Sequence, residues 1–295
     1  MPFNTLVSTS DLALHLDDPS WVILDCRHDL LNPAFGRDAY ARGHIPGARF
    51  ISIDDDLADH AASLTGGRGR HPLPTPEALS ATFSRLGIDG AKQVVAYDNA
   101  GGSYAARAWW CLRWLGQPAV AVLDGGITQW SAEGRLETAE LPTWRTTTFS
   151  AEVHDELKVD ATAIMLQLAN PVQQGDRQVG LRVIDARAPE RYNGSIEPID
   201  PKAGHIPGAL NRFWKNNLDA NGRFKHGSLL RAEFGDMLAG MNPAQWIHQC
   251  GSGVTACHNL LAMEHAGLGG GRLYPGSWSE WCADPARPVA IGDTP

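Results

Sequence analysis

The sequence predicts an α/β fold made of two similar domains in tandem, each a parallel sheet wrapped by helices. Apolar segments that read as strands alternate with segments that read as helices, an order typical of parallel βαβ units. The second half of the chain also repeats motifs of the first half in the same order. A length of 295 residues fits two domains of ordinary size.

Strand and helix signals follow one another regularly through the first half. Ser8 is a helix-capping residue type ahead of an apolar-periodic segment, and Thr75 with Pro76 marks another helix start. Runs rich in apolar and β-branched residues predict buried strands at 21–25, 93–98 and 119–123, and a further helix is expected over 105–115.

The second half repeats these motifs in the same order. Asp185-Ala-Arg follows a strand-like run as Asp25-Cys-Arg does, and Gly-His-Ile-Pro-Gly-Ala occurs at 43–48 and again at 204–209. Later motifs are spaced more closely in the second copy, which places about ten extra residues near 58–70 of the first. We expect an N-terminal domain over 1–140, a linker over 141–157 and a C-terminal domain over 158–295. The polar run 173–178 indicates a surface loop.

Composition excludes several classes of function. A net charge of −8 gives no reason to expect nucleic acid or an anionic membrane as a partner. Neither an apolar run of about 18 residues nor a secretory signal is evident. Five cysteines without a Cys-x-x-Cys pair argue against a disulfide framework or a metal site, and favour a reducing compartment, the cytoplasm. No cofactor is expected.

The stretch Cys-Gly-Ser-Gly-Val-Thr-Ala at 250–256 is the strongest candidate for chemistry. It lies between a strand expected over 246–249 and a helix expected over 258–264, so backbone N–H groups converge at the helix start. Glycines allow close backbone approach, and the helix N-terminus favours thiolate, the nucleophilic form of cysteine. A buried structural cysteine is the competing interpretation, because free cysteine is among the most buried residue types.

This loop resembles the active-site loop of 3-mercaptopyruvate sulfurtransferases, in the rhodanese superfamily. The motif match covers seven residues, and the tandem repeat extends the resemblance over nearly the whole chain. The resemblance implies two rhodanese-like domains, of which the first is inactive. Asp98 stands at the loop position of the first copy, where it cannot act as a sulfur nucleophile.

The resemblance also implies roles for individual residues. Cys250 would carry the sulfur, and Ser252, His71 and Asp54 would form a proton-moving arrangement. Arg191 matches the family's substrate-binding arginine, while Ile199 stands where the family often has a second arginine, for which Lys202 is a candidate replacement. The backbone of the loop would contact the substrate through Gly251, Gly253, Val254 and Thr255.

Other chemistry-bearing residues have simpler interpretations. His44 and His205 occur in both copies, so turn hydrogen bonding fits them better than catalysis. Cys257 reads as a helical core thiol, although a resolving thiol is the alternative. The run Arg68-Gly69-Arg70 is expected in a solvated loop, with a position facing the site as the alternative.

The implied function is transfer of sulfane sulfur from 3-mercaptopyruvate through a Cys250 persulfide to a thiol such as thioredoxin, to a small thiol or to cyanide. A thiosulfate:cyanide sulfurtransferase is the alternative, although such proteins usually have Arg-Lys where this chain has Gly251-Ser252. A cysteine phosphatase needs an arginine at position 256, which is alanine. A non-catalytic binding module is expected to lack the cysteine.

Overall fold

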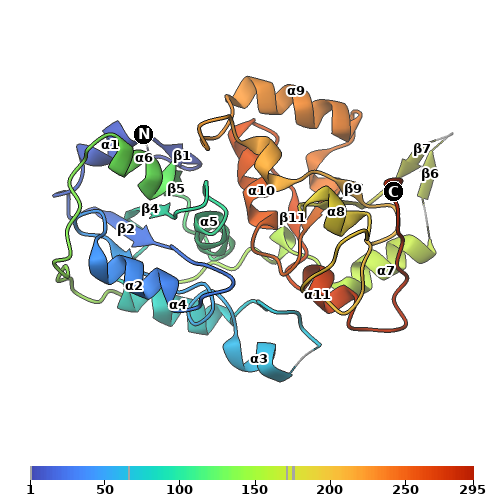
Figure 1. The fold of residues 1–295 in the computed structure, drawn as a ribbon, viewed down its shortest axis with the longest axis horizontal. Coiled ribbons are helices and arrows are strands. Elements are labelled where there is room, and N and C mark those ends of the chain that lie inside the picture. Colours follow the sequence, from blue (N-terminus) through green and yellow to red (C-terminus); the bar gives the residue numbers. More distant parts are fainter. Residues whose placement is uncertain (1, 66, 171, 175–176) are drawn as a thin grey trace. The chain divides into compact units, whose positions relative to one another are not determined.

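The computed structural model describes residues 2–65, 67–170, 172–174 and 177–295 (Figure 1). These residues form two compact units. The first comprises Met1–Asp59, Leu73–Asp155 and Leu218–Phe224, and the second comprises His60–Pro72, Glu156–Asn217 and Lys225–Pro295. The segments 60–72 and 218–224 thus cluster with the unit that holds the opposite half of the chain, which no local sequence signal indicated. The domain boundaries expected from the sequence stay a prediction.

The first unit is built on a five-stranded parallel sheet. In sheet order its strands are β1 (Leu6–Val7), β5 (Val120–Leu123), β4 (Gln93–Tyr97), β2 (Trp21–Asp25) and β3 (Arg49–Phe50). All four pairings are parallel, and Asp25 stands opposite Tyr97. The strands predicted at 21–25, 93–98 and 119–123 are therefore confirmed to within one residue.

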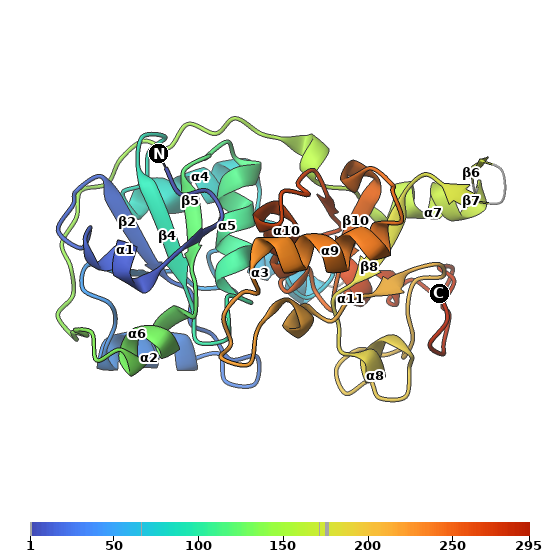
Figure 2. The ribbon, with the colours of Figure 1, turned by 90° about the horizontal axis from the view of Figure 1, so that it is seen from above.

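Helices cover both faces of this sheet, with α2 and α6 on one side and α4 and α5 on the other (Figure 2). The Ser8 hydroxyl accepts the Asp11 N–H and the Thr75 hydroxyl accepts the Ala78 N–H, so both predicted caps are confirmed. The helices of this unit are α1 (Thr9–Ala13), α2 (Phe35–Arg42), α4 (Pro76–Arg85), α5 (Ala105–Trp114) and α6 (Gly126–Ala132).

The second unit has a four-stranded parallel sheet. Its strands in order are β11 (Arg272–Leu273), β10 (Trp246–Gln249), β8 (Arg182–Asp185) and β9 (Leu210–Asn211). Gln249 stands opposite Asp185, so the residues after β10 and β8 emerge at one carboxyl edge. Parallel sheets usually bind ligands at that edge. Two parallel sheets, each with helices, confirm the predicted tandem α/β fold.

Helices also surround the second sheet. Ile164, Trp278 and Trp281 pack with Val183 and Ile247 of the sheet in one buried core. The helices of this unit are α3 (His60–Thr65), α7 (Ala161–Ala169), α8 (Pro189–Tyr192), α9 (Gly227–Leu238), α10 (Ala256–His265) and α11 (Ser277–Trp281). Single 3-10 turns occur at Asp155–Leu157, Trp214–Asn217 and Pro243–Gln245.

The segment expected as a surface loop at 173–178 is instead largely strand. β6 (Val172–Gln174) pairs antiparallel with β7 (Arg177–Val179), and residues 175–176 between them lie outside the described residues. The sequence was misread because the polar residues suggested a turn, whereas strand pairing needs only backbone N–H and carbonyl groups and so admits polar residues.

The two Gly-His-Ile-Pro-Gly turns are built alike. The His44 ring stacks on Tyr40 and its Nδ1 lies 2.8 Å from the Tyr40 carbonyl oxygen. His205 repeats this on Tyr192, with a distance of 2.9 Å. Because both rings are fully buried in equivalent contacts, the prediction that these histidines stabilise turns is confirmed.

Asp98 directly follows β4, as Cys250 directly follows β10. Its buried carboxylate accepts four backbone N–H groups over distances of 2.7–2.9 Å, from Ala100, Gly102, Tyr104 and Ala105. Burial raises the pKa of Asp98, and the four donors act in the opposite direction. The loop of the first copy thus encloses an anionic group that belongs to the chain itself.

We expect Asp98→Ala to lower the free energy of unfolding by about 3 kcal/mol or more, because it leaves several inward-facing N–H groups without an acceptor. Asp89→Ala is the matched control, since the Asp89 carboxylate accepts, among the described residues, only the N–H of Ala91 at an exposed turn. That variant should lose about 1 kcal/mol or less. Urea unfolding followed by tryptophan fluorescence compares them, and equal losses would contradict the role given to the Asp98 carboxylate.

Candidate functional site

Cys250 opens the loop between β10 and α10, as predicted. Its backbone N–H donates to Ser277 Oγ at 3.1 Å, and its carbonyl accepts the Trp278 N–H at 3.0 Å. The N–H of Gly253 points at Cys250 Sγ across 3.2 Å. The leading N–H groups of α10 have no acceptor within the helix. The sulfur therefore lies in a loop that is hydrogen-bonded to the 277–278 segment and that directs the Gly253 N–H at it.

Gly253 has a φ of +79°, in the left-handed region. A Cβ atom there would lie 2.3 Å from the carbonyl oxygen of Pro275. Both the backbone conformation and the contact exclude a side chain. Glycine at this position therefore sets how closely the loop approaches the 275–278 segment.

Ser252 and His71 are brought together. Ser252 Oγ lies 2.7 Å from His71 Nδ1, although the two residues are 181 positions apart. His71 belongs to the segment 60–72 that clusters with the second unit, so this contact lies inside one unit. With Nδ1 unprotonated, the imidazole accepts the hydroxyl hydrogen and can serve as a base.

Asp54, the third residue of the expected proton-moving arrangement, belongs to the first unit. Its Oδ2 lies 3.9 Å from His28 Nδ1 within that unit. A partnership between Asp54 and His71 stays a prediction.

Arg191 lies on the short helix α8 and contacts two carboxylates. Its Nε and Nη2 donate to both oxygens of Glu197, and Nη2 also donates to Asp200 Oδ2 at 2.9 Å. Burial by itself would raise the pKa of Glu197, but the hydrogen bonds and charge of Arg191, together with the backbone N–H groups of Ile199 and Asp200, outweigh it and the pKa is lowered. Nη1 lies 3.4 Å from the Cβ position that a side chain at Gly251 would have. One edge of the guanidinium is thus held by acids, while another nitrogen faces the cysteine loop.

Arg70 contradicts the expectation of a solvated loop. Its Nη1 contacts Asp200, and its Nη2 lies 2.9 Å from the same Cβ position at Gly251. The backbone N–H of Arg70 donates to Ser279 Oγ at 3.1 Å. Sequence reasoning had a position facing the site only as the alternative, because the contacts of this residue join distant parts of the chain and its position next to His71 was the one available signal.

The candidates for the family's second arginine lie differently. Ile199 has an exposed side chain without a hydrogen-bond donor, and its backbone N–H donates to Glu197. Lys202 contributes its backbone carbonyl, which accepts Trp278 Nε1 at 2.9 Å. A role for the Lys202 ammonium stays a prediction.

The four other cysteines are buried free thiols. Burial raises the pKa of Cys26, Cys111 and Cys282, which disfavours their thiolates. The Cys257 thiol donates to the Gly253 carbonyl at 3.3 Å and so supports the loop from the helix. These contacts fit the packing roles expected from the sequence.

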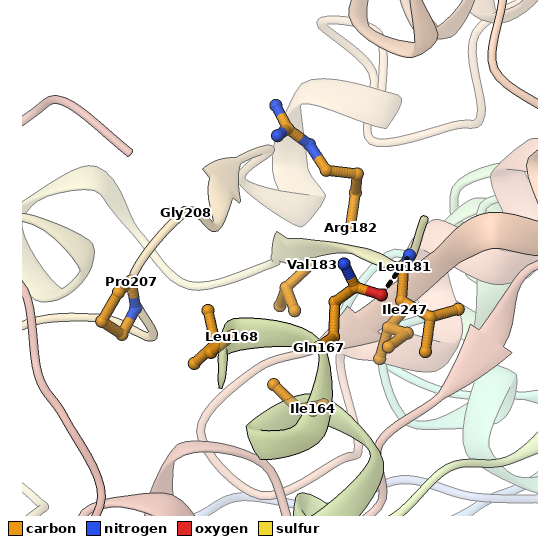
Figure 3. A pocket seen from close by; sticks show the side chains of 9 residues that line it. All are labelled: Ile164, Gln167, Leu168, Leu181, Arg182, Val183, Pro207, Gly208 and Ile247. Atoms are coloured by element: carbon orange, nitrogen blue, oxygen red, sulfur yellow. Dashed lines mark hydrogen bonds between the residues drawn. The ribbon is translucent and has the colours of Figure 1, made fainter. Parts of the chain in front are cut away.

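A separate hollow lies beside α7 (Figure 3). Its walls include Ile164, Leu168, Arg182 and Val183. Arg182 begins β8, so this hollow reaches the amino end of the sheet, whereas Cys250 follows the carboxyl end of β10. Its lining contains no nucleophilic side chain.

Within the described residues, no group of three or more His, Cys, Asp and Glu side chains is arranged to hold a metal ion. Among the same residues, every helix is too short or too polar to cross a bilayer.

Comparisons with known proteins agree on one family. The model of the rhodanese-like domain matches residues 8–133 and 166–284. A probable 3-mercaptopyruvate sulfurtransferase of Pseudomonas aeruginosa is 43% identical over 98% of both chains, and a putative thiosulfate sulfurtransferase of Mycobacterium tuberculosis is 40% identical over 97% of both. The crystal structure of the Escherichia coli 3-mercaptopyruvate sulfurtransferase SseA superimposes with a TM-score of 0.76 at 32% identity, covering 94% of this chain and 99% of that one.

The close approach at Gly253 predicts a specific intolerance to side chains. Gly253→Ala combines the positive-φ cost with the clash against Pro275, so the loop must move and reaction at Cys250 should fall at least tenfold. Gly208→Ala is the matched control, because Gly208 has the same φ of +79° and nothing within 4 Å of its Cβ position. It should cost about 1–2 kcal/mol of stability and leave Cys250 reactive. Denaturant unfolding and alkylation rates measure both effects, and similar reactivity in the two variants would contradict this account.

Proposed function

The chain belongs to the rhodanese family, and from this premise we propose that it moves sulfane sulfur from 3-mercaptopyruvate to an acceptor through a persulfide on Cys250. The observation that carries the proposal is the 2.7 Å hydrogen bond between Ser252 and His71. Ser252 stands two positions after Cys250 in the same loop. When 3-mercaptopyruvate loses its sulfur, the enolate of pyruvate remains, and a proton must be added to its carbon to give pyruvate. Cleavage of thiosulfate has no such step, so a hydroxyl–imidazole pair favours the first donor.

In the first half-reaction the Cys250 thiolate attacks the donor sulfur. The new S–S bond forms as the C–S bond breaks, and the bonding electrons pass to the enolate of pyruvate. The donor's thiol proton moves through Ser252 and His71 to the enolate carbon, which gives pyruvate and a Cys250 persulfide anion. The backbone N–H groups of Gly251, Gly253, Val254 and Thr255 would stabilise this anion or bind the donor. Asp54 is proposed to orient His71.

In the second half-reaction an acceptor takes the outer sulfur and releases the Cys250 thiolate. A thiolate acceptor becomes a persulfide, whereas cyanide becomes thiocyanate, so no electron donor is needed in either case. Thioredoxin or a small thiol is the proposed acceptor. The five free thiols fit a reducing compartment, for which we propose the cytoplasm.

The alternative is a thiosulfate sulfurtransferase, the name given to the Mycobacterium tuberculosis relative. A thiosulfate dianion favours an excess of positive charge beside the sulfur. Gly251 and Ser252 provide none, and the nearby Arg191 is matched by carboxylates. Arg191 can instead bind the single carboxylate of 3-mercaptopyruvate. This balance of charge favours 3-mercaptopyruvate.

Intact-mass spectrometry under steady donor supply tests the function. With 3-mercaptopyruvate and no acceptor, the protein should gain one sulfur, about 32 Da, which Cys250→Ser should not gain.

Steady-state kinetics with cyanide as acceptor test the choice of donor. The kcat/KM for 3-mercaptopyruvate should exceed that for thiosulfate at least tenfold, equivalent to about 1.4 kcal/mol. Comparable values for the two donors would leave only a general sulfurtransferase.

Removal of the Ser252 hydroxyl should slow sulfur transfer from 3-mercaptopyruvate much more than transfer from a donor that needs no carbon protonation. Ser252→Ala should lower kcat with 3-mercaptopyruvate roughly 100-fold, because the proton no longer has its relay to the enolate. Loading of Cys250 from inorganic polysulfide needs no carbon protonation, so its rate should fall less than threefold. Ser84→Ala, at a serine distant in sequence on α4, controls for loss of a half-buried hydroxyl. Equal losses with both sulfur sources would assign Ser252 a purely structural role.

A further inference from the structure

We propose that Ser279 is a positioning residue whose hydroxyl fixes the placement of His71 against Ser252. This inference rests on the proposed function, in which Ser252 and His71 carry the proton to the enolate. Ser279 lies on α11, outside both the cysteine loop and the segment 60–72. It acts through the segment that carries His71, and not on the reacting atoms themselves.

The backbone of Ser279 is joined to the cysteine loop. Two successive N–H groups of α11 donate to carbonyls of that loop, Trp278 to Cys250 at 3.0 Å and Ser279 to Gly251 at 2.9 Å. The first N–H groups of a helix have no acceptor within the helix, so these bonds satisfy them. Ser279 is only 9% exposed. Its position is therefore fixed relative to the loop that holds the sulfur.

The hydroxyl of Ser279 joins this backbone to a second segment. Its Oγ accepts the Arg70 N–H at 3.1 Å and donates to the Gly276 carbonyl at 3.2 Å. A hydroxyl has one donor and two acceptor sites, so it makes both bonds at once. The residue immediately before His71 is thereby held to the helix that contacts the cysteine loop.

Gly69 permits this close approach. It has a φ of +85°, and a Cβ atom there would lie 2.6 Å from the Gly276 carbonyl oxygen and 3.0 Å from Ser279 Oγ. Only glycine fits both the conformation and the contact. The Ser63 hydroxyl donates to the Arg70 carbonyl at 2.8 Å. Both polar backbone groups of residue 70 are therefore bonded, one of them to Ser279.

The proton step should be more sensitive to these contacts than the attack by sulfur. His71 Nδ1 lies 2.7 Å from Ser252 Oγ, and proton transfer needs such a separation, about 2.6–3.2 Å. A misplacement of about 1 Å can cost roughly 100-fold in rate. Ser279→Ala removes the acceptor of the Arg70 N–H but keeps the backbone bond to Gly251. The cysteine loop should therefore stay in place while His71 shifts.

A purely structural role is the competing explanation, in which the Ser279 hydroxyl only stabilises the unit as a whole. Diethyl pyrocarbonate distinguishes the two, because it acylates unprotonated imidazoles that it can reach. General loosening would raise the labelling of every histidine, including His205, whose ring is fully buried in the same unit. Displacement of the segment 60–72 would raise the labelling of His71 alone.

We would measure these labelling rates by peptide mass spectrometry in the full-length protein, Ser279→Ala and Ser279→Thr. In Ser279→Ala the labelling of His71 should rise at least threefold, because its segment is released, and that of His205 should stay unchanged. Ser279→Thr keeps a hydroxyl and should label as the unmodified protein does.

A pair of glycine variants tests the same contact from the other side. Gly69→Ala places a Cβ against α11 and should raise the labelling of His71 as Ser279→Ala does. Gly67→Ala is the matched control, because Gly67 has a φ of +81° and nothing within 4 Å of its Cβ position. It should leave the labelling of His71 unchanged.

Steady-state kinetics then connect the placement of His71 to the reaction. In Ser279→Ala, kcat with 3-mercaptopyruvate should fall roughly tenfold, whereas loading of Cys250 from inorganic polysulfide should change less than twofold. Unchanged labelling of His71 would overturn the positioning role even if the unmodified protein uses 3-mercaptopyruvate well, and so would equal losses with both sulfur sources. Faster labelling of His71 alone, in a protein that does not use 3-mercaptopyruvate, would keep the positioning role and reject the proposed function.

Discussion

A chain of alternating charges, buried at Asp185 and Arg187 and half-buried at Arg191 and Arg70, connects the second sheet to the cysteine loop, and the candidate site depends on it. The chain begins where β8 ends and runs through Asp185, Arg187, Glu197, Arg191, Asp200 and Arg70. Each guanidinium contacts a carboxylate on at least one side. A buried ion pair contributes little net stability by itself, but removal of one partner strands an uncompensated charge at a cost of about 3–5 kcal/mol. Every member therefore fixes its neighbours.

The first ion pair of this chain, between Asp185 and Arg187, has a counterpart in the first copy, between Asp25 and Arg27, and stabilises the fold. Arg27 Nη2 bridges Asp25 and the Gly43 carbonyl with distances of 2.6 and 2.7 Å, and Arg187 repeats both distances with Asp185 and Gly204. This link joins the strand end to the following turn. Because the first copy has it too, it does not by itself make a site.

The two loops differ in where the anion comes from. In the first copy the carboxylate of Asp98 occupies the backbone donors, so the loop is satisfied from within. In the second copy Cys250 stands at that position, and the Gly253 N–H points at its sulfur. One architecture can thus enclose a fixed anion or present its donors to a sulfur that carries charge. The exchange of Asp98 for Cys250 therefore changes what the backbone donors of the loop face.

Sequence reasoning succeeded where the signal was local. Hydrophobic runs and capping residues such as Thr75 predicted strands and helices because burial and capping repeat within a few residues. The contact of Ser252 with His71 followed from family resemblance, since no local pattern links residues 181 positions apart. For the same physical reason, a position of Arg70 facing the site was only the alternative. Its segment clusters with the second unit, which only the tertiary structure shows.

The charge balance at the site constrains how a donor can be recognised. Along the chain of ion pairs three guanidiniums face three carboxylates, so no excess of positive side-chain charge results. Burial raises the pKa of Asp200 and the nearby Arg70 opposes that rise, so the balance near the loop depends on this one acid. A balanced set gives little long-range attraction, and affinity must come from N–H groups aimed at particular oxygens. Lysine would supply the same charge without the fork, which is why the direction of the arginine nitrogens over Gly251 carries more weight than their charge.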